Sequence, residues 1–158
     1  MLTQHTFHIH CIGKNKDAFV SSGISHFETQ IKKYCRIEFS YIKESSHTAI
    51  PKKIMEDSLS LVKSLSGINN PFIISLCEGP CVKNSVEGAK LLQQWMNQSL
   101  HPVFIIGGAF GLSEDLKKQS RSRLSLSPLT FNHQLVRLIL AEQLFRWLNI
   151  LYGGDYHH

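Results

Sequence analysis

Short apolar runs alternate with longer segments that repeat apolar residues every three or four positions, and this alternation limits the possible folds more than any other feature. Two runs, 72–76 and 103–106, are largely apolar throughout, as expected for strands covered on both faces. Two others, 7–11 and 37–41, alternate apolar and polar residues. Strands that alternate with helices predict an α/β domain with a mainly parallel sheet flanked by helices.

Helical periodicity fills the intervals between these runs. Apolar residues recur at helical spacing over 24–34, 54–65 and 86–96, and Pro51 stands where a first helical turn tolerates proline. The longest predicted helix runs from about His133 to Leu151, and its apolar residues occupy more than one stripe. A sheet on one side cannot cover them all. We favour a second subunit as the cover over a central place within the monomer.

The length and charge of the chain bound its organisation. With 158 residues we expect a single domain over 1–158. Lysine and arginine exceed aspartate and glutamate by 17 to 12, which permits a polyanionic partner. Basic residues come at most in pairs, so folding or dimerisation must assemble any basic surface. The N-terminus lacks a secretory pattern and no run approaches the length of a membrane span, so we expect a cytoplasmic protein with no membrane partner.

Metal and hydrolase chemistry are disfavoured. Cys11, Cys35, Cys77 and Cys81 lack the paired spacing of a zinc site, and we expect free thiols. The pair His8 and His10 lies on one face of a strand, but exposed histidines are a commoner interpretation than metal ligands. We therefore expect no metal. Neither a GxSxG nucleophile elbow nor an HExxH helix is present.

A glycine-rich turn, GGAFG at 107–111, follows directly after a predicted buried strand. This is where an α/β sheet offers its ligand crevice, and glycines let backbone N–H groups approach a ligand. The GGxxG spacing matches neither a dinucleotide fingerprint nor a P-loop. A structural turn, capped by Ser113 before a short helix, is an equally good interpretation.

The segment LSLSPLTFNH at 124–133 begins like the end of a strand and leads into the longest helix. Pro128 fixes an irregular loop, whose backbone groups could hold an adenine or a carboxylate. On the residues alone, an ordinary loop in which Asn132 or Thr130 caps the helix is favoured.

Polar residues on the last helix could carry chemistry. His133 and Arg137 are four apart and share a helical face, where an imidazole could accept a proton and a guanidinium could hold an anion. Glu142 and Arg146 are better explained as an ion pair. The aromatic residues of the tail, 152–158, could stack on a base, although a frayed terminus is the default expectation.

Taken in order, IIGGAFGLS and LSLSPLTFNHQLVRLILAEQLFRWLNILYGGDYHH resemble the C-terminal half of the ribosomal RNA large subunit methyltransferase H family, within the SPOUT methyltransferase class. The similarity is strong over 103–157 and extends more loosely to Leu76 and to CIGKNK near the N-terminus. It implies a homodimer with a C-terminal trefoil knot. It also implies S-adenosylmethionine-dependent N3-methylation of a pseudouridine in 23S rRNA of the assembled ribosome.

The resemblance further implies a set of site residues. Those expected to bind the methyl donor are Leu76, Gly107, Gly108, Ser127, Pro128, Leu129, Thr130, Phe131 and Asn132. Those expected in catalysis are His133, Arg137, Tyr156 and His157. His133, or a tail histidine of either subunit, would take the imide proton from N3 while Arg137 stabilises the anionic base. Phosphate contacts are expected from Lys14, Lys16, Arg137 and Arg146.

The chain departs from the family pattern at two places. The family commonly reads HPLVR where this chain has HQLVR at 133–137, and Pro-Tyr-His-Arg where this chain has Asp155-Tyr156-His157-His158. These changes affect the rigidity of the tail and one phosphate contact, while all four expected catalytic residues are retained. Two other functions stay open: a SPOUT methyltransferase acting on tRNA, and a ribosome-associated RNA-binding protein that has lost catalysis.

Overall fold

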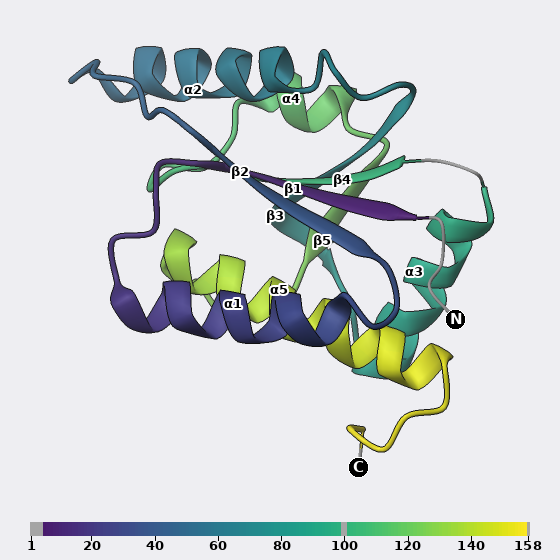
Figure 1. The fold of residues 1–158 in the computed structure, drawn as a ribbon. Helices are drawn as coiled ribbons and strands as arrows, with labels where there is room; N and C mark the ends of the chain where they lie inside the picture. Colours follow the sequence, from purple (N-terminus) through teal and green to yellow (C-terminus); the bar gives the residue numbers. More distant parts are fainter. Residues whose placement is uncertain (1–4, 99–100, 158) are drawn as a thin grey trace.

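A five-stranded sheet forms the middle layer of the structure (Figure 1). The computed structural model describes residues 5–98 and 101–157. Its strands are β1 (Thr6–Ile12), β2 (Arg36–Ile42), β3 (Pro71–Cys81), β4 (His101–Ile106) and β5 (Ser122–Ser125). They lie in the order β2-β1-β4-β3-β5, and each of these neighbours pairs in parallel. The predicted α/β class with a parallel sheet is confirmed.

Helices cover both faces of this sheet. They are α1 (Ala18–Ile31), α2 (Ile50–Ser64), α3 (Ser85–Asn97), α4 (Glu114–Gln119) and α5 (His133–Leu151). In Figure 1, α2 and α4 lie on one face and α1, α3 and α5 on the other. Each face has its own apolar core. Strand β4 contributes Phe104 to one core and Ile105 to the other, which explains why its sequence is apolar without alternation.

The parallel pairing brings the carboxyl ends of three strands to one edge of the sheet. Ile106 at the end of β4 pairs with Cys11 of β1 on one side and with Leu76 of β3 on the other. The segments that follow these three residues therefore start side by side. This edge is where a parallel α/β sheet places its ligands.

Strand β3 is longer and less regular than the run at 72–76 predicts. Leu76 pairs with Leu124 of β5, but the next pair joins Cys81 to Ser125. Residues 77–80 have no partner in that ladder, so the backbone of β3 bulges away from β5. This bulge shapes one wall of the cavity described below.

Helix α5 lies between α1 and α3, which cover part of its apolar surface within the chain (Figure 1). On one side the ring centroid of Phe145 lies 6.1 Å from that of Phe27 in α1. On the other side the buried indole of Trp147 packs against Gly88 of α3. The wide apolar surface of α5 is thus partly covered within the chain, while several of its apolar side chains remain only partly buried. The homodimer and the trefoil knot stay predictions of the family resemblance.

Replacing Gly88 by alanine should destabilise the protein, because a methyl group there would overlap the indole of Trp147. Overpacking a core costs about 1–3 kcal/mol, whereas alanine gains roughly 1 kcal/mol over glycine in a helix. We expect urea denaturation to show a net loss of up to about 2 kcal/mol in the free energy of unfolding. Gly67→Ala is the matched control, since the described residues leave open space there, and its stability should hold or rise slightly. Equal stability of the two variants would contradict the packing.

Candidate active site

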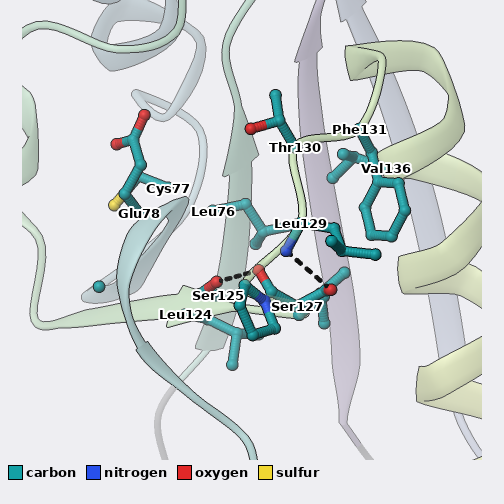
Figure 2. Close-up of a pocket in the computed structure, with 13 residues that line it drawn as sticks. Leu76, Cys77, Glu78, Leu124, Ser125, Ser127, Leu129, Thr130, Phe131 and Val136 are labelled. Atoms are coloured by element: carbon teal, nitrogen blue, oxygen red, sulfur yellow. Dashed lines mark hydrogen bonds between the residues drawn. The ribbon is translucent and has the colours of Figure 1, made fainter.

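A cavity of about 370 Å³ opens at the carboxyl ends of β3 and β5 (Figure 2). Its walls come from the bulged end of β3 at 76–79, from the end of β5 and the following loop at 124–131, and from Val136 of α5. Figure 2 shows Cys77 and Glu78 on one side and Leu129, Thr130 and Phe131 on the other. Cavities of roughly 300–1,000 Å³ hold small organic ligands in proteins. The cavity is therefore large enough for a nucleoside-sized molecule.

Short-range hydrogen bonds brace the loop that forms one wall. The Ser125 hydroxyl donates to the carbonyl oxygen of Ser127 at 2.9 Å, and the Leu129 N–H donates to the Ser127 hydroxyl at 3.1 Å (Figure 2). At the end of the loop, Asn132 accepts a hydrogen bond from the Gln134 N–H at 2.8 Å and caps α5. These hydrogen bonds fix the conformation of the loop. The apolar side chains of Leu76 and Leu124 form other parts of the cavity wall.

The structure brings together most of the residues expected to bind the methyl donor. Leu76 lines the cavity, together with Ser127, Pro128, Leu129, Thr130 and Phe131. Gly107, Gly108 and Asn132 do not line it. The two glycines nevertheless start the segment beside Leu76, because they follow Ile106, its partner in β4.

Sequence reasoning missed part of the cavity wall. Cys77, Glu78 and Gly79 line it because of the bulge in β3, and Leu124–Leu126 line it through the end of β5. The Gly79-Pro80 pair was the local signal that a regular strand could not continue there.

His133 is the first residue of α5 and is partly buried beside the capping loop. Burial lowers the pKa of its imidazole below the ordinary value of 6.5, the positive charge of Arg137 lowers this pKa further, and Glu44 opposes them. The imidazole is therefore neutral near physiological pH. In that form it can accept a proton.

Arg137 has a different set of partners from those we expected. Its side chain is 0% exposed, and its guanidinium donates to the carbonyl oxygens of Ile12 and Gly13, the latter at 3.0 Å, and to Asn15 Oδ1 at 2.9 Å. All three acceptors lie at the end of β1 or in the loop that follows it. This arrangement favours a positioning role over the expected contacts with a phosphate or with the reacting base.

Gln134, where the family commonly has proline, holds the same loop. Its side-chain oxygen accepts a hydrogen bond from the Lys16 N–H at 2.8 Å, and the side chain is buried. The first two turns of α5 therefore fasten the β1–α1 loop, while the side chains of Lys14 and Lys16 remain exposed.

The tail residues lie at the opposite end of α5. His133 begins this 19-residue helix, and the ring of Tyr156 packs beside Phe145, twelve residues and therefore about 18 Å further along the helix axis. The ring of Tyr156 packs on Phe145 with 4.6 Å between centroids, and the Arg146 guanidinium lies 4.6 Å from the centre of the tyrosine ring. One chain therefore does not bring Tyr156 and His157 to His133. His158 lies outside the described residues.

The predicted ion pair between Glu142 and Arg146 on α5 is confirmed, and it engages the guanidinium of Arg146. Its Nε donates to Glu142 Oε1 at 2.9 Å, and a second guanidinium nitrogen donates to the same oxygen at 2.7 Å. With the ring of Tyr156 on its other side, this guanidinium has partners within its own chain.

The histidine pair on β1 has protein partners. His8 Nδ1 lies 3.4 Å from a carboxylate oxygen of Glu38, and His10 Nδ1 lies 2.7 Å from the Ser64 hydroxyl. Over residues 5–98 and 101–157, no three histidine, cysteine, aspartate or glutamate side chains gather closely enough to hold a metal ion. Within the same ranges, no helix has the length and apolar character needed to cross a membrane.

Comparison with known proteins agrees with this architecture. A family model described as a predicted SPOUT methyltransferase matches residues 6–157. A protein of Thermodesulfovibrio yellowstonii named ribosomal RNA large subunit methyltransferase H is 35% identical over 154 residues, covering 98% of this chain and 99% of that protein. A protein of the same name from Maridesulfovibrio salexigens is 32% identical over 149 residues, covering 93% and 94%.

Solved structures share the fold at low sequence identity. A probable methylase family protein from Haemophilus influenzae Rd KW20 superposes with a TM-score of 0.57 at 9% identity, covering 96% of this chain and 70% of that one. A probable methyltransferase from Bordetella pertussis Tohama I gives 0.55 at 13% identity, covering 92% and 95%. Because the family model and relatives above 30% identity span nearly the whole chain, the chain belongs to the SPOUT methyltransferase family.

Proposed function

We propose that this chain transfers the methyl group of S-adenosylmethionine to N3 of a pseudouridine in 23S rRNA within the assembled ribosome. The observation that carries the proposal is the cavity at the carboxyl ends of β3 and β5, lined by Leu76 and by the loop at 127–131. These are residues that the resemblance assigns to the donor. The names of the relatives support ribosomal RNA as the substrate class.

The cavity fits a nucleoside donor in size and chemistry. Apolar walls at Leu76 and Leu124 suit an adenine ring, and the backbone groups of the loop at 127–131 suit its polar edge. When bound, the donor supplies an electrophilic methyl group on a positively charged sulfur.

The side chains of this protein have two tasks in the transfer. His133 accepts the imide proton of N3, which frees the lone pair that attacks; a base of this kind contributes roughly 10²- to 10⁴-fold. The second task is positioning, which contributes up to about 7–11 kcal/mol when the reactants are well oriented. Arg137 and Gln134 act here by holding the β1–α1 loop against α5.

The distribution of charge fits an RNA substrate on the same edge of the sheet. The exposed side chains of Lys14 and Lys16 are free to contact phosphates, because the backbone rather than the cations holds their loop. Arg137 is buried and Arg146 is paired, so we assign the phosphate contacts to the two lysines.

We further propose that the active form is a homodimer. Tyr156 and His157 lie at the far end of α5 from His133, so they can join the site only from a second copy of the chain. A dimer that places one tail beside the other subunit's cavity would complete the set of residues implied by the resemblance.

Ser127→Ala should weaken donor binding about two- to tenfold, because the loop loses one bracing hydrogen bond worth about 0.5–1.5 kcal/mol. Calorimetric titration with S-adenosylmethionine measures this change as a shift in Kd. Ser66→Ala, in the exposed turn after α2, is the control and should bind like the wild type. Absence of any binding to the wild type would refute the assignment of the cavity.

His133→Ala should lower the single-turnover methylation rate by roughly 10²- to 10⁴-fold. In the wild type the rate should rise with pH as the imidazole loses its proton, with a midpoint below the ordinary histidine value of 6.5, and this acid limb should vanish in the variant. His26→Ala, on the exposed side of α1, serves as the control. An unchanged rate in His133→Ala would remove this residue from the role of base.

The wild type should methylate ribosomes well and naked 23S rRNA poorly, because a chain of 158 residues presents a small basic edge and relies on the shape of its target. Transfer of labelled methyl to each substrate, at equal RNA concentration, measures the difference. Equal labelling of both would contradict ribosome dependence, and labelling of tRNA alone would point to a different SPOUT activity.

A further inference from the structure

Phe110 stands in the glycine turn after β4 with 49% of its surface exposed. It belongs to neither of the two apolar cores. A single exposed phenylalanine is ordinary on a protein surface. Its significance here depends on how rigidly it is held and on what lies beside it.

The turn that carries Phe110 is fixed at both ends. A Cβ at Gly107 would lie 2.5 Å from the carbonyl oxygen of Gly111, so the two arms of the turn approach closely, and the Gly111 N–H donates to the Gly108 oxygen at 3.1 Å. After the turn, the Ser113 N–H donates to the Ser58 hydroxyl of α2 at 2.9 Å. The backbone therefore presents the ring without a large loss of freedom on binding.

The turn starts at the same edge of the sheet as the candidate active site. It follows Ile106, which pairs with Leu76 at the cavity wall. On the other side, a Cβ at Gly108 would lie 3.3 Å from Ile12 Cγ2, at the end of β1. The exposed lysines Lys14 and Lys16 come directly after that strand end.

We propose that Phe110 stacks on an unstacked base of the RNA substrate and holds that nucleotide at the mouth of the donor cavity. An aromatic face beside exposed cations is the combination by which proteins bind single-stranded nucleotides, because every base offers a π-face and every phosphate a charge. The inference rests on the proposed function. It adds a residue that positions the substrate without taking part in proton or methyl transfer.

Three substitutions separate stacking from other roles. Phe110→Ala should raise the ribosome concentration for half-maximal single-turnover rate by about 5- to 150-fold, which corresponds to the stacking of one base. Phe110→Leu keeps an apolar side chain but no aromatic face, and should behave like the alanine variant. Phe110→Trp should retain wild-type behaviour. The S-adenosylmethionine Kd should stay unchanged in all three.

Met55→Ala is the control, since it removes a large exposed side chain from the neighbouring helix α2 and leaves the turn itself unchanged. Wild-type kinetics in Phe110→Ala or Phe110→Leu would overturn the inference. A lower molar mass of Phe110→Ala in light scattering would also overturn it, because the ring would then be a contact between subunits.

If the wild type methylates no RNA, the proposed function is wrong, and stacking is then tested by the additional tryptophan fluorescence of Phe110→Trp. Quenching of this fluorescence by RNA would support the inference, and unchanged fluorescence would overturn it.

Discussion

A buried guanidinium joins the first strand to the last helix, and the geometry of the candidate active site depends on it. A charge without solvent is costly unless hydrogen bonds compensate it. Arg137 meets most of this requirement through the carbonyl oxygens of Ile12 and Gly13 and the side chain of Asn15, and the ring of Tyr41 lies 5.8 Å away. Its Nε is buried without a hydrogen-bond partner among the described residues. The contact fixes α5 relative to the edge of the sheet. The loop before α5, which forms a wall of the cavity, is thereby fixed as well.

The layered fold could be predicted because its signals are local. Strand β4 is apolar from Pro102 to Ile106 since both its faces are buried there, and each strand before it is separated from the next by a helical pattern. The place of α5 could not be predicted in the same way. The apolar pattern of α5 shows that a large surface must be buried, but it does not show against what. Only the tertiary structure shows that α1 and α3 bury part of that surface.

The residues of the candidate site likewise divide into those that could be predicted from the sequence and those that only the tertiary structure shows. The loop at 127–131 could be found because its order of residues is specific to the family, and the same resemblance implied Leu76. Residues 77–79 could not, since the bulge exists only through pairing with β5. The burial of Arg137 also escaped prediction: an arginine four residues after a histidine suggests a polar helix face, while its acceptors lie more than 120 residues earlier in the chain.

The ordered conformation of the tail at 152–157 affects how two subunits could form one active site. The Tyr156 N–H donates to Asn149 Oδ1 at 2.8 Å, and the Gly154 N–H donates to the Asn149 carbonyl oxygen at 2.9 Å, so the tail is fastened to its own helix. In the proposed homodimer this segment would reach the neighbouring subunit already folded, and the entropy of ordering it would not oppose RNA binding. The turn that carries Phe110 is preorganised in the same sense. Rigid surfaces of this kind suit an enzyme whose rate depends largely on holding two reactants in line.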